Sequence, residues 1–409
     1  MGDYFLSAIN TVKEWVSIKS VKDFACEGAP FGKNLNNMLN KALSDANSLG
    51  FETKNYDGYI GEVVFGEGDD KDGLAILCHL DVVPEGDLSK WQTSPYICQE
   101  KDGYLIGRGV VDDKAPAVLC LYALKELKDQ GFKPSKKIKL IFGLDEESGW
   151  ACIDHYKKVA VMPKTGFSPD AEFPVIYAEK GILHVEFLFD IGTQKISSLS
   201  GGERVNMVCD YASCTLQSGE EISFNGVSAH GSTPSLGDNA IKKLLNYLAS
   251  NGYVDREIYL SLFENDSLLD GIEDESGKIT FSPNVIDFKD GVLSVKTDIR
   301  YPCTYKKEQI ENTIKKLGKF NVLSHQAPIM SDKNGELVKT LLDVYNKEFE
   351  CNEKPIAIGG GTYARALENG VAFGPSNDEP CHVPNEKIKI EKLKKCYSVY
   401  KSAIYELTK

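Results

Sequence analysis

The sequence predicts an α/β protein of two domains: a mixed, mostly parallel sheet with helices on both faces, and an inserted α+β domain with an antiparallel sheet. Three observations support this fold class. The chain has 409 residues, which is too long for one compact core. From residue 59, short apolar strands alternate with helical periodicity. After Asp170 several strands are grouped with two helices, and near Ser331 the strand–helix alternation returns.

The first domain is expected over residues 1–180 and 329–409, and the inserted domain over 181–328. A polar turn, EGDDKDG, follows the first strand and indicates a hairpin that would give the sheet an antiparallel edge. In the first domain we expect strands at 59–65, 73–81, 138–144 and 371–374, and helices at 115–131, 147–158, 336–349 and 390–407. In the inserted domain we expect strands at 182–190, 220–226 and 292–301, and helices at 239–250 and 306–318.

Composition excludes several classes of protein. The net charge of −13 argues against a nucleic-acid partner, because phosphate binding requires a basic face. No stretch approaches the roughly 20 apolar residues of a membrane span. The eleven cysteines form no CxxC pair, and several lie inside apolar segments, as free thiols of cytoplasmic proteins do. We therefore expect a cytoplasmic protein.

Polar residues follow the expected strands, where open α/β sheets bind their ligands. The strand GLAILC ends in His79, Leu80 and Asp81. Residues two apart in an extended chain share a face, so one side chain could bind a metal ion while the other fixes its ring. The alternative is a surface histidine beside an acidic turn residue.

Acidic residues recur at three further points. Asp112 and Asp113 follow the apolar segment LIGRGVV, the stretch LDEESG contains Asp145, Glu146 and Glu147, and Asp170 lies between two prolines. Helix capping could explain one acid at each helix start, but not all of them. A second histidine, His382, lies in the loop CHVPNE; its neighbour Cys381 could suggest a thiol nucleophile, although adjacent side chains of an extended chain diverge.

Buried carboxylates in such numbers are costly unless cations neutralise them. Asp112, Glu147 and Asp170 contribute −3, two divalent ions contribute +4, and one hydroxide would bring the sum to zero. This is the charge balance of a two-metal hydrolase. Mixed imidazole and carboxylate ligands suit Zn²⁺, with Mn²⁺ or Co²⁺ as alternatives.

The segments HLDVVPEGD, GRGVVDDKAP, LDEESG, SPDAEFP and CHVPNE, taken in this order, resemble the M20 metallopeptidase family, in its PepV-like and Sapep-like dipeptidase branch. The resemblance implies that Asp112 bridges two metal ions, with His79 and Asp170 completing one site and Glu147 and His382 the other. It also implies that Glu146 is the general base, that Asp81 orients His79, and that the Asp112–Asp113 peptide bond is cis.

In the inserted segment, GGERVNM, FNGVSAHGSTP and DIRYP resemble the lid-domain motifs of the same branch. This implies that His230 meets the scissile carbonyl oxygen, with assistance from Asn206. Arg300 and Arg365 are candidates to hold the substrate carboxylate. Gly360, in the run of three glycines, would let the backbone approach the substrate; a phosphate loop is a poor alternative, because the Lys-Ser/Thr ending is absent.

The function expected from this resemblance is hydrolysis of dipeptides with a free N-terminus, through a metal-bridging water that Glu146 activates. An N-acyl amino acid deacylase of the aminoacylase or desuccinylase type is the alternative within the same superfamily. A non-catalytic peptide-binding protein is a remote alternative. We expect a monomer, with a homodimer as the alternative, and a small peptide as the partner.

Overall fold

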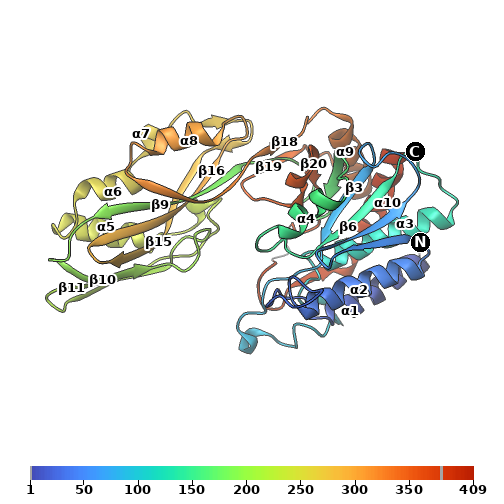
Figure 1. Cartoon of the computed structure of the whole chain (residues 1–409), viewed down its shortest axis with the longest axis horizontal. Helices are drawn as coiled ribbons and strands as arrows, with labels where there is room; N and C mark the ends of the chain where they lie inside the picture. Colours follow the sequence, from blue (N-terminus) through green and yellow to red (C-terminus); the bar gives the residue numbers. More distant parts are fainter. Residues whose placement is uncertain (1, 378–380) are drawn as a thin grey trace. The chain divides into compact units, whose positions relative to one another are not determined.

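The computed structural model describes residues 2–377 and 381–409 of the chain. These residues form two compact units: Met1–Tyr177, Met330–Ile356 and Thr362–Lys409 make up the first, and Ala178–Ile329 and Ala357–Gly361 the second. Residues 357–361, which the predicted bounds place in the first domain, group with the second unit. Each unit has its own sheet, and the predicted fold class is confirmed (Figure 1).

The first unit is built on a nine-stranded mixed sheet in the order β1-β2-β6-β3-β7-β20-β8-β18, with β19 paired to β8. The four central strands, β6, β3, β7 and β20, pair in parallel with one another. The strands are β1 (Glu52–Tyr56), β2 (Ile60–Phe65), β3 (Leu74–His79), β6 (Ile138–Gly143), β7 (Thr165–Ser168), β8 (Ile176–Glu179), β18 (Ile329–Met330), β19 (Ile356–Ile358) and β20 (Asn369–Ala372).

The hairpin predicted between β2 and β3 is wrong. Strand β6 lies between them, antiparallel to β2 and parallel to β3. The backbone N–H of Leu74 donates to the carbonyl of Lys137 over 2.8 Å, so β3 is aligned with β6 from its first residue. A polar turn predicts that the chain reverses, but not which distant strand fills the space beside it. The antiparallel edge arises instead from β1 and β2.

Helices cover both faces of this sheet. A side chain at Gly61 of β2 would meet Leu39 and Leu43, which places α2 on one face. The next residue, Glu62, points to the other face and accepts a hydrogen bond from Tyr156 of α4. Every residue of β3 and β6 is buried, as strands covered on both sides are. The helices are α1 (Gly2–Val16), α2 (Lys33–Ser48), α3 (Lys114–Asp129), α4 (Ala151–Val159), α9 (Glu336–Phe349) and α10 (Ile390–Thr408).

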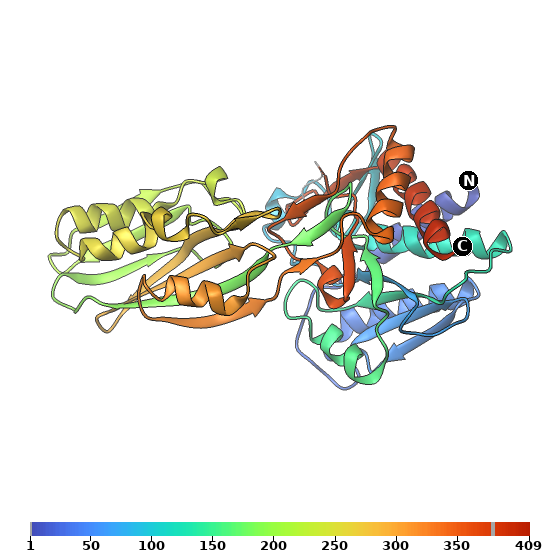
Figure 2. The same ribbon diagram turned by 90° about the horizontal axis from the view of Figure 1, so that it is seen from above.

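The second unit has a seven-stranded antiparallel sheet in the order β12-β11-β10-β15-β16-β9-β17. Helices α5 (Ala240–Ser250) and α6 (Arg256–Phe263) lie side by side along one face (Figures 1 and 2), and α8 (Lys307–Ile314) adds Ile310 and Ile314 to the same apolar core. The strands are β9 (Gly181–Asp190), β10 (Ile196–Gly201), β11 (Tyr211–Leu216), β12 (Glu221–Asn225), β15 (Thr280–Lys289), β16 (Val292–Tyr301) and β17 (Phe320–Gln326).

Smaller elements complete the two units. A three-stranded sheet joins β4 (Gln99–Lys101), β5 (Tyr104–Ile106) and β21 (Lys387–Lys389). The second unit also contains the short helix α7 (Asp266–Leu269) and a ribbon of β13 (Glu273–Asp274) and β14 (Gly277–Lys278). Within the described ranges, 2–377 and 381–409, no helix has the length and apolar character needed to cross a bilayer.

Candidate metal centre

The predicted ligands of the first unit follow elements that end at one edge of the nine-stranded sheet. Strands β3, β6 and β7 are parallel, so their carboxyl ends meet at that edge. His79 is the last residue of β3, Glu147 follows β6, and Asp170 follows β7. Asp112 precedes α3, and His382 lies in the loop before β21. Residues from five distant parts of the chain are therefore available to one site.

Asp112 lies at the centre of this group. Its Oδ1 is 2.7 Å from Nε2 of His79, and its Oδ2 is 2.8 Å from Nε2 of His382. The same nitrogen of His382 is 2.9 Å from Oε1 of Glu147. One carboxylate thus has a different histidine at each oxygen, the arrangement that a bridging ligand requires. The Asp112–Asp113 peptide bond is cis, as the resemblance implies.

The donor atoms fit a divalent cation. His79 Nε2 and Asp112 Oδ1 are buried and close together, yet among the described residues neither atom has a partner in hydrogen-bond geometry. Ligand atoms of His79, Asp112 and Asp170 all lie within 4.8 Å of one another. Imidazole nitrogens and carboxylate oxygens that converge without bonding one another are suited to ions such as Zn²⁺ or Mn²⁺.

The acids and histidines perturb one another strongly. Burial, followed by the charge of Asp112, raises the pKa of Asp170 to about 7. Burial also raises the pKa of Glu146 well above its usual range. For His382, burial acts to lower the pKa, but Asp112 and Glu147 outweigh it and raise the pKa to about 11. His382 therefore holds a proton where a cation would otherwise provide the positive charge.

Asp81 fixes the turn that contains Glu146 and Glu147. Its two carboxylate oxygens accept the backbone N–H groups of Glu146, over 3.1 Å, and Glu147, over 3.0 Å. Nδ1 of His79 lies 2.9 Å from the backbone carbonyl of Asp81 but 3.5 Å from its carboxylate. The expected orientation of His79 by Asp81 thus runs mainly through the carbonyl, which accepts the Nδ1 proton and leaves Nε2 free for a metal ion.

Helix α4 begins at Ala151, not at residue 147 as predicted. The carboxylate of Asp145 accepts hydrogen bonds from the backbone N–H of Ala151, over 3.0 Å, and from the Ser148 hydroxyl, over 2.5 Å, and pairs with Lys22 over 2.6 Å. Asp145 therefore holds the turn that precedes the helix. Glu146 and Glu147 belong to that turn and not to the helix, so neither is needed as a cap.

Cys381 lies near the same group, and the next residue, His382, has a left-handed backbone with φ of 62°. Its sulfur and ligand atoms of Asp112 and His382 lie within 4.8 Å of one another. The premise that these neighbours diverge in an extended chain is therefore wrong here. Burial and the charges of Asp112 and Glu386 raise the pKa of the Cys381 thiol, which makes it a poor nucleophile.

A second group of predicted residues lies together in the second unit. The backbone N–H of Ser232 donates to Nδ1 of His230 over 3.2 Å, and the Ser232 hydroxyl is 2.7 Å from the same nitrogen. The N–H of Gly231 donates to the backbone carbonyl of Asn206 over 2.7 Å. Because Nδ1 accepts a backbone N–H, the ring carries its proton on Nε2. Sequence reasoning did not identify Ser232, although it lies two residues after His230.

Arg300 is 4% exposed and already has protein partners. It donates to both carboxylate oxygens of Asp298, over 2.7 and 2.9 Å, and to the carbonyl of Gly359, over 2.9 Å. A side chain at Gly359 would lie 2.7 Å from Cβ of Ser232, so glycine is required there by close approach of another segment of the second unit. Gly360 belongs to the same loop, whereas Arg365 lies in the first unit, in the short helix Tyr363–Ala366. The substrate roles of Arg300, Arg365 and Gly360 stay predictions.

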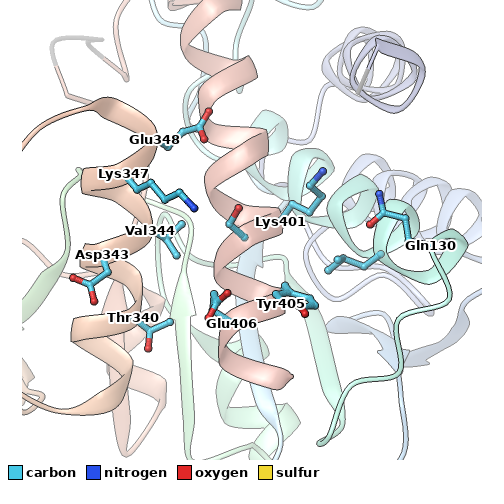
Figure 3. Close-up of a pocket in the computed structure, with 11 residues that line it drawn as sticks. Gln130, Thr340, Asp343, Val344, Lys347, Glu348, Lys401, Tyr405 and Glu406 are labelled. Carbon is cyan, nitrogen blue, oxygen red and sulfur yellow. The ribbon is translucent and has the colours of Figure 1, made fainter.

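A groove lies elsewhere in the first unit, among α3, α9 and α10. Figure 3 shows its charged lining, which includes Asp343, Lys347 and Lys401. Among the described residues that line it, none is a predicted ligand.

Residues 75–406 match the model of Peptidase family M20/M25/M40. The chain belongs to this family. It is 34% identical to a protein named "Putative dipeptidase YtjP" from Bacillus subtilis, over 98% of this chain and 97% of that one. It is also similar in structure to human carnosine dipeptidase 1, with a TM-score of 0.65 at 16% identity, covering 99% of this chain and 96% of that one. For aminopeptidase PepT from Bacillus cereus the TM-score is also 0.65 at 16% identity, with 98% of each chain covered. At these identities the two solved structures show the shared fold.

We expect metal binding to release protons and to strengthen as the pH rises. The pKa of His382 is raised to about 11 and that of Asp170 to about 7, so near neutral pH the metal-free protein holds a proton on His382 and is partly protonated at Asp170. A ligand nitrogen or oxygen must lose its proton to bind a metal ion, and acid therefore competes with the metal. Calorimetric titration with Zn²⁺ between about pH 6 and about pH 8, in buffers of different ionisation enthalpy, measures both effects. An affinity that does not change with pH, without net proton release, would contradict this assignment.

Proposed function

We propose that the protein is a dipeptidase that uses two divalent ions to hydrolyse short peptides with a free N-terminus. The observation that carries the proposal is the carboxylate of Asp112, which has His79 at one oxygen and His382 at the other. Two ligand sets that share one carboxylate are suited to a pair of metal ions. The name of the Bacillus subtilis relative supports the choice of dipeptides.

In this proposal His79, Asp112 and Asp170 hold one ion, and Asp112, Glu147 and His382 hold the other. When bound, divalent ions lower the pKa of water and polarise the peptide carbonyl group. The residues around the site give each ligand a fixed direction. The carbonyl of Asp81 fixes the tautomer of His79, and its carboxylate fixes the turn that presents Glu147.

Glu146 is the proposed general base. It follows Asp145 in the turn after β6, and the carboxylate of Asp81 accepts its backbone N–H. Burial raises the pKa of its carboxyl group. The carboxylate is therefore a stronger base toward the attacking water, and the protonated group can return the proton to the leaving amine. Because Glu147 is one residue further along the turn, the two carboxylates need not compete for the same position.

His230 is the proposed donor to the carbonyl oxygen of the substrate. Since the backbone N–H of Ser232 donates to its Nδ1, the ring proton is on Nε2. A neutral imidazole with that proton can donate to the oxygen as negative charge develops there. Asn206 supports the loop through its backbone carbonyl.

Three further properties belong to this proposal. Zn²⁺ is the expected ion, with Mn²⁺ or Co²⁺ as alternatives, because imidazole and carboxylate ligands suit all three. The protein acts as a monomer on a small peptide. Its compartment is the cytoplasm, in line with eleven cysteines that are all free thiols in the structure.

We expect Glu146→Gln to keep both metal ions and to lose turnover by at least about 100-fold, the lower range for removal of a general base. Glutamine has nearly the same size as glutamate but cannot accept the proton. Metal content by mass spectrometry and kcat for a dipeptide measure the two effects separately. As a matched control, Glu172→Gln changes a different glutamate of the first unit and should leave both values unchanged. A kcat equal to that of the wild type would show that another residue is the base.

The class of substrate is tested by comparing dipeptides with the corresponding N-acetyl and N-succinyl amino acids. We expect hydrolysis of the dipeptides at kcat/KM values at least tenfold above those for the acylated compounds, about 1.4 kcal/mol in transition-state binding. Liberated amino acid, measured by chromatography, gives all the rates on one scale. Activity confined to the acylated compounds would establish an N-acyl amino acid deacylase instead. Metal binding without hydrolysis of either class would indicate a non-catalytic binding protein.

A further inference from the structure

We propose that Glu386 is a positioning residue that joins the segment containing His382 to the loop containing Asp112, so that the two segments are assembled before any metal ion binds. The inference rests on the proposed function, in that Asp112 and His382 are taken as metal ligands. Asp112 and His382 are far apart in the sequence. A contact between their two segments is therefore needed to bring them together.

The carboxylate of Glu386 is bonded almost entirely to the loop before Asp112. Its Oε1 accepts the backbone N–H groups of Val111 over 2.9 Å, Gly109 over 3.1 Å and Asp112 over 3.4 Å. Its Oε2 accepts a hydrogen bond from Nη1 of Arg108 over 2.7 Å. The last of the three backbone donors belongs to Asp112 itself. Glu386 therefore fixes the backbone from which the bridging carboxylate projects.

Strand pairing brings Glu386 to this position. Strand β21 begins at Lys387 and is antiparallel to β5, with Lys387 opposite Ile106. The backbone N–H of Gly107 donates to the carbonyl of Glu386 over 3.0 Å, which extends the pairing by one residue. Beyond that point one segment leads to Asp112 and the other to His382. Glu386 is thus the last connection before the two predicted ligands.

Other contacts hold the same two segments in place. Arg108 is 1% exposed and lies over the ring of Trp91, 5.4 Å from its centroid. The side chain of Asn385 accepts the N–H of Gln92 over 2.8 Å and donates to the carbonyl of Lys90 over 2.8 Å. The segment 381–386 is therefore attached on two sides without any contribution from a metal ion.

The nature of the contacts favours a positioning role over a merely structural one. Glu386 is 1% exposed, and three N–H groups converge on one of its oxygens. Hydrogen bonds to an ionised carboxylate are stronger than those between neutral groups. Partners that orient metal ligands in this way commonly affect metal affinity by about 10–100-fold.

Hydrogen exchange of the metal-free wild-type protein tests the assembly without any substitution. We expect the peptide that covers residues 107–112 to be protected from exchange in the absence of metal ions, because Glu386 already binds its N–H groups. Mass spectrometry after chelator treatment measures this protection. Rapid exchange that becomes slow only after Zn²⁺ is added would overturn the proposal, since the loop would then be ordered by the metal.

Glu386→Gln tests the consequence for the metal centre. We expect its affinity for Zn²⁺, measured by calorimetry, to fall by about 10–100-fold, with faster exchange in residues 107–112. Glu391→Gln is the matched control, because Glu391 lies five residues further along, exposed in the first turn of α10. Wild-type affinity in Glu386→Gln would overturn the proposal.

A second variant applies if Glu386→Gln does not fold. Arg108→Gln keeps the three N–H groups on Oε1 but removes the charge beside Oε2, and we expect a smaller loss of Zn²⁺ affinity in the same direction. Unchanged affinity in this variant would also overturn the proposal. None of these measurements uses a peptide substrate. A wild-type protein that binds metal ions but fails to hydrolyse dipeptides would therefore refute the proposed function alone.

Discussion

The structure depends on one electrostatic constraint: Asp112, Glu146, Glu147 and Asp170 are placed close together at the edge of one sheet, where burial disfavours their charges. Burial raises the pKa values of Glu146, Glu147 and Asp170. Only Asp112 has a lowered pKa, because His79 and His382 together outweigh its burial. Like charges at this density are stable only with cations or bound protons to balance them. The arrangement is thus a site that protons occupy in the absence of a metal ion.

Because the central strands are parallel, the predicted site residues meet at one edge of the sheet. A small number of buried acids then hold the loops that carry these residues. The register of β3, β6 and β7 brings His79, the turn after β6 and Asp170 to the same edge. Asp81 then fixes the turn after β6 through two backbone N–H groups, and Glu386 fixes the loop before Asp112 through three. In the second unit, Ser232 does the equivalent for His230. In each case a hydrogen bond from a backbone N–H holds a predicted site residue or the loop that carries it.

Much of this could be predicted from the sequence, because local patterns determine it. Apolar runs that end in polar residues identified β3 and β6 together with His79, Asp81 and Glu147, and the periodicity of the last helix identified α10. Long-range pairing could not be predicted in the same way. The turn after β2 indicated a hairpin, yet β6 lies between β2 and β3 because strand order depends on non-local hydrogen bonds. For the same reason the sequence did not show that the Asp81 carboxylate binds N–H groups of the turn after β6. Nor did it show that Arg300 is paired with Asp298, or that Glu386 joins two distant segments.

In the proposed function the carboxylate of Asp112 is shared by two metal ions. Anomalous diffraction from crystals loaded with Zn²⁺, collected on both sides of the zinc absorption edge, tests it most directly. We expect two anomalous peaks per chain, each within about 2.0–2.2 Å of a different oxygen of Asp112, the usual distance for zinc and a carboxylate. One peak should be bound by His79 and the other by His382. A single peak, or two peaks of which one has no contact with Asp112, would show that two metal ions do not share this carboxylate.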